Sequence, residues 1–258
     1  MAELRNYTSL RVGGPAKNFV DAHNESEIIA AIEAAGDTPV LIIGGGTNIL
    51  VADSGFDGTV IRITNHALKS EVDACSGATL SIGAGENWDK FVQISIERGF
   101  AGLETLSGIP GTVGAAPIQN IGAYGVELQD RFDALDAIDL ATGNTFTLDA
   151  AQCAFGYRDS IFKHGPGQTV GASRSMGLAG RALITRVRFR LAKAWKPVLG
   201  YLDLEKKMTE TGIDQPSAHQ IFEWVCAIRR SKLPDPAVIG NAGSFFKNPT
   251  VTPEQCAD

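Results

Sequence analysis

Apolar side chains recur at the spacing of an amphipathic helix in three stretches that lie far apart in the chain. The first is 25–35, which follows Asn24, and the second is 87–98, which Gly99 ends. The third starts at Ser217. On one side of the third stretch lie the apolar residues Ile221, Phe222, Val225 and Ile228. Because asparagine suits a helix start and glycine a helix end, the pattern predicts three helices.

Extended segments are predicted between these helices, where apolar residues form short runs or alternate with polar ones. The segments are 39–51, which contains three glycines, 79–83, 134–149 and 182–191. The polar, glycine-rich stretch 164–181 precedes the last of them and is expected to be a surface loop.

The glycine loop Gly44-Gly45-Gly46-Thr47-Asn48 joins the two apolar runs of 39–51. No helix is expected after it, and Ile49 stands where a dinucleotide fingerprint needs a third glycine, so that fingerprint is excluded. Consecutive backbone N–H groups in a glycine loop can still hold a phosphate without a helix dipole. A tight turn between two strands is an equal alternative at this point.

The segment 106–125 reads LSGIPGTVGAAPIQNIGAYG, without a charged residue and too rich in glycine for a regular helix or strand. It is either a pocket lined by backbone or a disordered stretch. Disordered segments normally carry charge and few large apolar residues. This one contains Ile109, Val113, Ile118 and Ile121, which favours a pocket against which a flat ring system can lie.

Three cations end the third predicted helix: Arg229, Arg230 and Lys232, just before the sequence LPDP. Positive charge is favourable at a helix C-terminus because of the helix dipole. These residues therefore fit two roles equally well: they stabilise the C-terminus of the helix, or they bind a phosphate.

The composition sets limits on the function. With 258 residues, 44 % of them hydrophobic, the chain can bury a core in one to three domains, and its net charge of -6 disfavours nucleic acid as a partner. The cysteines form no CxxC pair, so we expect buried free thiols, no disulfide framework and no metal site. They are Cys75, Cys153, Cys226 and Cys256. Neither a signal peptide nor a membrane-length apolar run is evident, so a cytoplasmic protein without membrane contact is expected.

Six stretches match one known family in the family's own order. They are LIIGGGTNIL from Leu41, GAGENW from Gly83, GLETLSGIPGTVGAAPIQNIGAYGVEL from Gly102, FGYRDSIFKH from Phe155, SKLPDP from Ser231 and GNAGSFFKNP from Gly240. A single glycine loop arises by chance, but six such stretches in order are highly specific. Over nearly its whole length, the chain resembles the bacterial UDP-N-acetylenolpyruvylglucosamine reductases, in their tyrosine-loop subclass.

The resemblance implies an α+β fold: an FAD-binding domain of the vanillyl-alcohol-oxidase type in two subdomains, followed by the start of a substrate-binding domain. These parts are expected at 1–66, 67–215 and 216–258. FAD is expected between the first two, without a covalent bond because the glycine loop contains no histidine. The residues expected to bind it are Gly44, Gly45, Gly46, Thr47, Asn48, Ile49, Leu50, Ile109, Pro110, Gly111, Gly114, Ile118, Gly122 and Arg229.

The family's reaction has two halves, and the resemblance implies both for this chain. NADPH reduces the flavin and leaves, and N5 of the reduced flavin then gives a hydride to UDP-N-acetylglucosamine enolpyruvate, forming UDP-N-acetylmuramate for peptidoglycan. The second half needs a cation and a proton donor. Arg158 resembles the family's cation and Ser244 its proton donor. The residues alone leave open an Arg158–Asp159 surface ion pair and a capping or turn role for Ser244.

Four further residues match positions on the family's substrate side: Tyr124, Tyr201, Lys232 and Asn248. Tyr201 resembles a tyrosine that closes over the substrate diphosphate, and a half-buried core aromatic is its alternative. Tyr124 is expected at the boundary between flavin and substrate. The expected partners are the enolpyruvyl substrate and NADPH, and a monomer is expected for the full-length protein.

The family also has a third catalytic residue, a glutamate near its C-terminus, and no position of this sequence matches it. Glu254 follows the GSFFKNP motif too closely and stands at a predicted helix start. The chain is therefore expected to be C-terminally truncated and impaired in the second half of the reaction. The alternative is a non-catalytic flavin-binding module, or a domain whose partner supplies the missing part.

Overall fold

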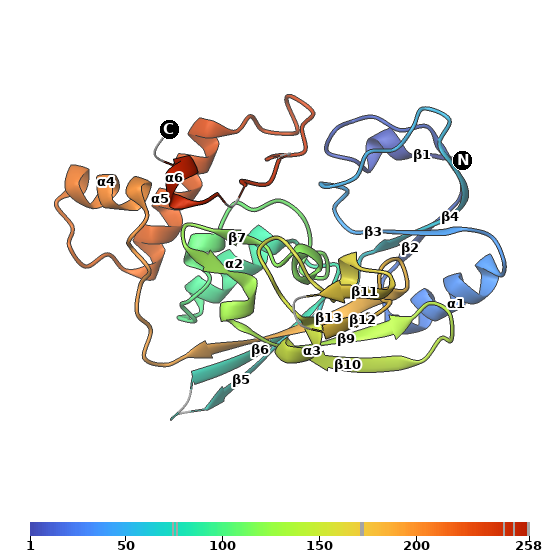
Figure 1. Cartoon of the computed structure of the whole chain (residues 1–258), viewed down its shortest axis with the longest axis horizontal. Helices are drawn as coiled ribbons and strands as arrows, with labels where there is room; N and C mark the ends of the chain where they lie inside the picture. The colour runs from blue at the N-terminus through green and yellow to red at the C-terminus, as the bar shows by residue number, and fades with distance from the viewer. Residues whose placement is uncertain (74, 76, 171–172, 245, 250, 257–258) are drawn as a thin grey trace.

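The framework of the molecule is a pair of β-sheets with helices packed against them (Figure 1). The smaller sheet is formed by residues 2–63 and the larger one by residues 68–192. The structure is a computed structural model. It describes residues 1–73, 75, 77–170, 173–244, 246–249 and 251–256.

The smaller sheet has the strand order β1-β2-β4-β3, in which the last three strands are parallel and β1 is antiparallel to β2. Helix α1 connects the parallel strands β2 and β3, which lie on either side of β4, and it packs against β2 and β4. The Asn24 side chain caps α1 by accepting a hydrogen bond of 2.9 Å from the Glu27 amide. The elements are β1 (Ala2–Glu3), β2 (Pro15–Ala22), α1 (Glu25–Ala35), β3 (Val40–Ile43) and β4 (Phe56–Ile63).

The larger sheet is antiparallel throughout, with the order β10-β9-β13-β6-β5. Its central strand places Val187 between Ile82 on one neighbour and Leu135 on the other, and all three side chains are buried. Cross-strand apolar contacts of this kind stabilise the sheet. The strands are β5 (Leu68–Asp73), β6 (Gly77–Gly83), β9 (Phe132–Asp139), β10 (Thr145–Asp149) and β13 (Ala182–Ala192).

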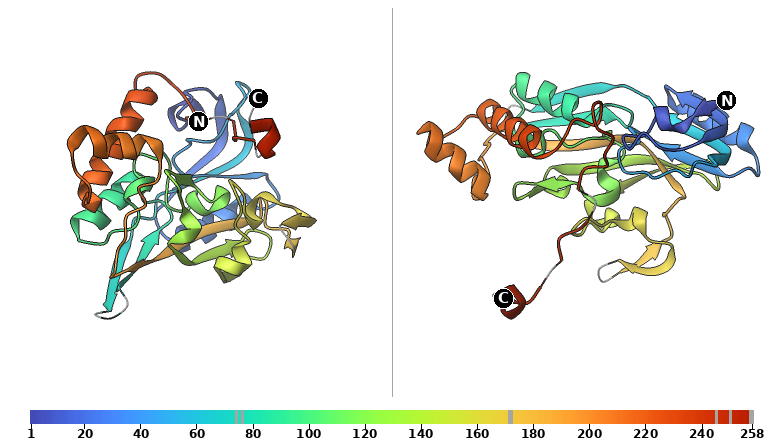
Figure 2. Two further views of the ribbon diagram at one scale, coloured as in Figure 1. Left: turned by 60° about the vertical axis from the view of Figure 1, so that its left-hand side comes forward. Right: turned by 90° about the horizontal axis from the view of Figure 1, so that it is seen from above.

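Three helices lie together at one end of the molecule (Figure 2): α2 (Trp88–Glu97), α4 (Leu202–Thr211) and α5 (Ala218–Lys232). Asn87 caps α2 and Ser217 caps α5 through a reciprocal capping box. The apolar side of α5 packs with Leu204 and Tyr124. The side chains that α5 contributes to this cluster are Ile221, Val225 and Ile228.

Short elements complete the connections. They are η1 (Leu4–Asn6), η2 (Glu104–Leu106), η3 (Ala116–Gln119), β7 (Gly122–Ala123), β8 (Val126–Glu127), η4 (Leu128–Asp130), α3 (Ala150–Cys153), η5 (Ile161–Lys163), β11 (Pro166–Val170), β12 (Ser173–Met176) and α6 (Pro253–Cys256). The loop predicted over 164–181 is wrong in part, because β11 and β12 pair there as an antiparallel hairpin. Residues 171 and 172 lie outside the described residues.

The main hydrophobic core joins the two sheets, α1 and α2. Its largest side chains include Trp88, Phe91 and Phe189, whose ring centroids lie 5.2 to 5.8 Å apart. The indole of Trp88 donates a 2.9 Å hydrogen bond to the Leu106 carbonyl. The core thus also anchors the glycine-rich segment that begins there.

The predicted helices are confirmed as α1, α2 and α5, and the strand predictions at 79–83, 134–149 and 182–191 as β6, β9 with β10, and β13. Within 39–51, the first apolar run forms β3, but the second run, 49–51, is not part of a strand. The boundaries at 66 and 215 stay a prediction.

Cysteine burial follows the expectation in two places. Cys153 and Cys226 are buried free thiols, and burial raises the pKa of Cys153 to about 12. Cys75 is exposed, so its predicted burial is wrong. The side chain of Cys256 lies outside the described residues.

Candidate active site

A cavity of about 460 Å³ lies between the two sheets, within the size range of small-molecule sites. Strand β3 and the glycine loop form one wall, the segment 110–121 forms another, and the start of β13 closes the back. Its lining is mostly apolar residues and glycines, with the neutral polar residues Thr47, Asn48, Thr112 and Gln119. Lys163 is the one charged residue among the described residues that line it. The glycine-rich segment is therefore ordered and lines a pocket, as the sequence predicts.

Close backbone approach is built into this cavity. A Cβ atom on Gly44 would lie 2.4 Å from the Thr112 hydroxyl, and one on Gly45 would lie 3.3 Å from the Cα of Gly111. Gly46 has φ +62° and Gly111 has φ +118°, values that disfavour other residues. Glycine is thus required where the two loops meet, and the bare backbone left exposed fits an aromatic ring with phosphate groups, as FAD has.

The structure brings most of the predicted FAD residues to this cavity. They are Gly44, Gly45, Gly46, Thr47, Asn48, Ile49, Pro110, Gly111, Gly114 and Ile118. Leu50 is the exception among the loop residues, because its side chain is 74 % exposed and lines neither this cavity nor the next. Ile109, Gly122 and Arg229 lie in the neighbouring hollow instead.

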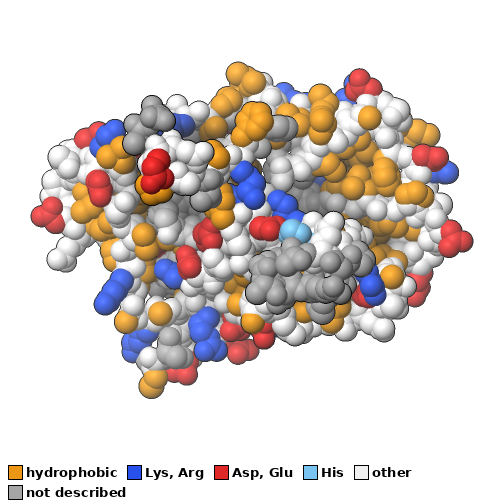
Figure 3. Space-filling view, viewed as in Figure 1, with side chains coloured by type: hydrophobic (Ala, Val, Ile, Leu, Met, Phe, Trp, Pro, Cys, Tyr) orange, Lys and Arg blue, Asp and Glu red, His pale blue; other side chains and the backbone are white. Residues whose placement is uncertain are grey.

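That neighbouring hollow, called the cationic chamber below, has a volume of about 450 Å³. Its cations are Arg158, Lys163, Arg229 and Lys247. None of the described residues that line it is acidic. Figure 3 shows Lys and Arg side chains gathered at the hollow in the middle of this face. The chamber and the cavity share the lining residues Thr47, Asn48, Pro110, Gln119, Ile121 and Lys163.

Arg158 reaches the chamber from a left-handed backbone conformation, with φ +53°. Its guanidinium donates hydrogen bonds to the carbonyl of Gly122 at 2.5 Å and to that of Asn120 at 3.4 Å. The alternative of an ion pair with Asp159 is not formed, because the Asp159 carboxylate contacts the His164 ring at 2.8 Å. Arg158 is thus fixed against the glycine-rich segment rather than tied to a neighbouring acid.

Ser244 and Asn248 line the same chamber from the C-terminal segment. Ser244 is exposed and follows Gly243, which has φ +66°. The structure therefore brings Ser244 and Arg158, 86 residues apart in the sequence, to one hollow.

Arg229 links helix α5 to the glycine-rich segment 106–125. Its Nε donates a 2.9 Å hydrogen bond to the Gly108 carbonyl, and burial lowers the pKa of its guanidinium. A Cβ on Gly108 would lie 3.0 Å from the Arg229 side chain, so the two pack closely. Of the three cations at the end of α5, only Arg229 lines the chamber among the described residues.

Tyr124, Tyr201 and Lys232 form a separate group. The two tyrosine rings meet edge to face at 5.1 Å, and burial raises the pKa of the Tyr124 hydroxyl. Lys232 pairs with Asp203 at 2.6 Å, which raises the pKa of the lysine. Tyr201 is 47 % exposed and its ring packs against Tyr124, so the alternative of a half-buried aromatic stays open. None of the three lines the cationic chamber.

Comparisons with known proteins decide the family. Residues 16–149 match the FAD binding domain family. Proteins of Pseudomonas syringae pv. tomato and Azoarcus sp., both named UDP-N-acetylenolpyruvoylglucosamine reductase, are 45 % and 48 % identical over 97 % of this chain and 70 % of their own length. The chain belongs to the UDP-N-acetylenolpyruvoylglucosamine reductase family.

A solved structure agrees with this assignment. The crystal structure of UDP-N-acetylenolpyruvylglucosamine reductase from Thermus caldophilus superposes with a TM-score of 0.66 at 25 % identity, over 96 % of this chain and 74 % of that one. The predicted family, the α+β fold with an FAD-binding domain of the vanillyl-alcohol-oxidase type, and FAD as cofactor are confirmed. As a member of this reductase family, the protein is an FAD-dependent oxidoreductase.

Several residues of the reductase site were not singled out from the sequence: Thr112, Gln119, Tyr157, Lys163 and Lys247. All five lie within the quoted family motifs, and all but Lys163 are next to predicted residues, so the motifs held a signal for them. Lys163 is the most informative, because it lines both hollows and its Nζ donates to the Arg158 carbonyl at 3.0 Å.

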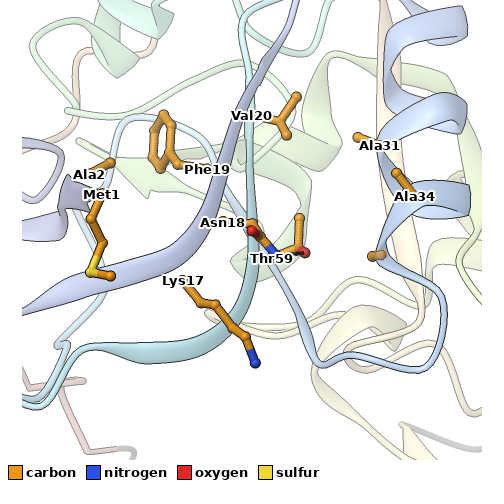
Figure 4. Close-up of a pocket in the computed structure, with 10 residues that line it drawn as sticks. Met1, Ala2, Lys17, Asn18, Phe19, Val20, Ala31, Ala34 and Thr59 are labelled. Carbon is orange, nitrogen blue, oxygen red and sulfur yellow. Dashed lines mark hydrogen bonds between the residues drawn. The ribbon is translucent and has the colours of Figure 1, made fainter.

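Another hollow of the reductase, about 750 Å³ and open to solvent, lies between β2 and α1 (Figure 4). Its polar side chains already have partners: Lys17 pairs with Asp57 at 3.0 Å, and Asn18 contacts Thr59 at 3.3 Å. It contains no predicted site residue. In the described part of the chain, no cluster of His, Cys, Asp or Glu could hold a metal, and no helix is both long and apolar enough to cross a membrane.

Proposed function

We propose that this protein reduces UDP-N-acetylglucosamine enolpyruvate to UDP-N-acetylmuramate for peptidoglycan, with FAD bound in the cavity and NADPH as the reductant. One observation carries the proposal: the cationic chamber opens onto the same residues as the glycine-lined cavity. An anionic substrate in the chamber therefore lies beside a ring system in the cavity. The names of the relatives support the same reaction.

The charge of the chamber suits these ligands. The substrate carries a diphosphate and a carboxylate, and NADPH also carries several phosphates. Four cations without an acidic neighbour among the described lining residues create a positive potential, which concentrates such anions. Bound FAD supplies the hydride that the substrate receives, having taken it from NADPH.

Arg158 is proposed to hold the enolpyruvyl carboxylate and to stabilise the negative charge that develops beside it. A guanidinium stays charged and has five N–H donors, so those not used by the Gly122 and Asn120 carbonyls remain for a carboxylate. Preorganised donors of this kind lower the energy of the transition state. The positive φ of Arg158 fits a functional residue held by its surroundings.

Ser244 is proposed to give the proton of its Oγ to the substrate carbon next to the carboxylate. A serine hydroxyl is a weak acid, so it needs nearby positive charge to stabilise the oxygen as the proton leaves. Arg158 and Lys247 line the same chamber and provide that charge.

The remaining site residues keep their predicted roles as proposals. Arg229 and Asn248 both line the chamber. As the resemblance implies, Arg229 is proposed to contact the cofactor and Asn248 the substrate. Tyr201 is proposed to close over the substrate diphosphate, Lys232 to lie on the substrate side, and Tyr124 to lie at the boundary between flavin and substrate. Leu50 faces solvent and carries no role here.

The two half-reactions test this assignment separately. Ser244→Ala is expected to leave the anaerobic bleaching of bound flavin by NADPH within about twofold, because that step needs no proton from Ser244. Reoxidation by the enolpyruvyl substrate is expected to slow by about 100-fold or more. Stopped-flow absorbance of the flavin measures both. Equal losses in both halves, or none, would contradict the role.

A matched control is Ser231→Ala, which removes a hydroxyl bonded to the Ile228 carbonyl within α5 and should change neither rate. The expected impairment of the second half-reaction stays a prediction, so each variant is compared with the unmodified chain. A chain that binds flavin but reacts with neither NADPH nor substrate would favour the non-catalytic module instead.

A further inference from the structure

Ser9 lies between the glycine loop and the segment that leads to Ser244. Its amide donates a 3.0 Å hydrogen bond to the Gly46 carbonyl. On the other side, its carbonyl accepts from the Asn241 amide at 3.0 Å, and its hydroxyl donates to the Asn241 carbonyl at 2.7 Å. One residue near the N-terminus thus bonds to both loops, although Asn241 is 232 positions away in the sequence.

The backbone is tightly packed on both sides of Ser9. A Cβ on Gly46 would lie 1.8 Å from the Tyr7 carbonyl oxygen, and one on Gly240 would lie 2.7 Å from that of Leu10. Both distances are shorter than side chains tolerate, so each contact depends on a glycine. Arg11 adds a further hydrogen bond from its guanidinium to the Ala237 carbonyl. The turn 7–11 is therefore held between the two loops rather than resting on one of them.

Asn241 carries these contacts on toward Ser244. Its side chain donates to the carbonyls of Pro234 at 3.0 Å and Ile239 at 2.8 Å, and its Oδ1 accepts from the Gly243 amide at 3.1 Å. Four hydrogen bonds therefore lead from Gly46 through Ser9 and Asn241 to Gly243, the neighbour of Ser244. Ser244 itself is exposed, so its position depends on how firmly this segment is held.

We propose that Ser9 is a positioning residue that couples the glycine loop of the flavin cavity to the segment bearing Ser244. The proposal rests on the proposed function, in which FAD occupies the cavity and Ser244 acts on the substrate. A cofactor that contacts the glycine loop restrains Gly46, and Ser9 passes this restraint to Asn241. Binding that orders one loop lowers the entropy cost of ordering the other. FAD thereby places the proton donor as well as the hydride donor.

Amide hydrogen exchange measures this coupling without relying on turnover. In the unmodified chain, saturating FAD is expected to slow exchange at the Asn241 and Gly243 amides about fivefold. A factor of this size is typical of coupling between two sites and corresponds to the net stabilisation from about one hydrogen bond. In Ser9→Ala, the slowing should fall below about twofold, while the Kd for FAD stays within about threefold. Ser9→Thr keeps the hydroxyl and should restore the effect.

Two controls match the change. Ser95→Ala removes a hydroxyl that donates to the Val92 carbonyl within α2, away from both loops, and should leave the FAD-dependent slowing intact. Gly240→Ala is a second disruption of the same contact, because its Cβ would lie 2.7 Å from the Leu10 carbonyl oxygen. It should abolish the FAD-dependent slowing of exchange although Ser9 is unchanged. Gly165→Ala is its control, since a Cβ there meets nothing closer than 3.8 Å.

Two results would overturn the proposal while leaving the flavin site in place. One is FAD binding to the unmodified chain without slower exchange at 241 and 243. The other is full FAD-dependent slowing in both Ser9→Ala and Gly240→Ala. A chain that takes up no FAD overturns this proposal together with the proposed function, so the two failures are distinguishable.

Discussion

The flavin cavity and the cationic chamber share several lining residues, but backbone shapes the cavity and long side chains shape the chamber. The cavity is shaped by backbone: glycines at 44, 45 and 111 let the glycine loop and the segment 110–121 pack closely, and Gly46 lets the glycine loop pass next to the Tyr7 carbonyl. The chamber is shaped by long side chains from three separate segments, among them Arg158, Arg229 and Lys247. The cavity therefore depends on glycines, which have no side chain, and the chamber depends on charged side chains.

This difference teaches where each half of the site is vulnerable. Added methyl groups should damage the cavity, because backbone cannot move aside without moving the sheet or loop behind it. Loss or shortening of a charged group should damage the chamber, because its cations attract the anionic reactants. Substitutions in the chamber should therefore spare the cofactor half, whereas damage to the glycine loop should also reach the segment of Ser244 through Ser9.

The largest effect is expected from Gly46→Ala. The new Cβ would lie 1.8 Å from the Tyr7 carbonyl oxygen, and the residue would keep φ +62°, so overpacking and backbone strain together should cost about 3 kcal/mol of unfolding free energy. Denaturant unfolding measures this, and flavin retention should be lost as well.

Gly212→Ala is the matched control, because Gly212 has φ +66° and lies in the left-handed region but meets nothing within 4 Å. It should cost only the conformational part, about 1 kcal/mol. Equal costs for the two substitutions would mean that the tight contact at Gly46 does not matter.

A chamber-specific effect is expected from Arg158→Lys. An ammonium cannot reproduce the fork that contacts the Gly122 and Asn120 carbonyls and still bind a carboxylate through two hydrogen bonds. Reoxidation by the enolpyruvyl substrate should slow about 100-fold, while FAD content and bleaching by NADPH stay unchanged.

Arg190→Lys serves as the control on the sheet surface, where its contact with Asp133 is 3.8 Å long. It should affect neither half-reaction. Loss of FAD from Arg158→Lys would contradict the separation between cavity and chamber.

A smaller, pH-dependent effect concerns the back wall of the cavity. Leu140 and Ala182 line it, and next to them Arg181 donates two hydrogen bonds to Asp139. These bonds lower the pKa of Asp139 to about 2 from its ordinary 3.8. Since the pKa is lower in the folded state, this stability is present above about pH 4 and is lost as the pH falls toward 2.

Asp139→Asn should therefore lower the Tm above pH 4, and the difference from the unmodified chain should shrink between pH 4 and 2. Asp133→Asn, which removes the longer and more exposed contact with Arg190, should give a small difference throughout. A difference that grows on acidification would have the wrong sign for this account.

Local signals explain why much of the fold was predictable. Asn24, Asn87 and Ser217 each cap a helix through hydrogen bonds within four residues, so their helices start where the sequence indicates. The position of the glycine loop was readable from its own residues, but the contacts that make it one wall of a cavity come from distant segments, at Tyr7, Gly111 and Thr112. The hairpin of β11 and β12 was missed because its glycine-rich sequence lacks the alternation that marks a strand.

Contacts between distant segments were not predictable from local pattern. Nothing near Ser9 indicates that its hydroxyl meets Asn241, and nothing near Arg158 indicates the Gly122 carbonyl as its partner. The family motifs placed Arg158 and Ser244 in one site, yet the cations around them follow from tertiary packing. Lys163 shows this most clearly, since only the folded chain places it between the two hollows.

The central claim is that a backbone-built cavity holds FAD beside a chamber that admits anionic reactants. The most direct test is the visible absorbance of the purified chain during anaerobic titration with NADPH, followed by denaturation. The account predicts bound flavin that NADPH bleaches and that denaturation releases, because no covalent bond holds it. A chain that stays colourless after addition of FAD, or bound flavin that NADPH does not bleach, would contradict it.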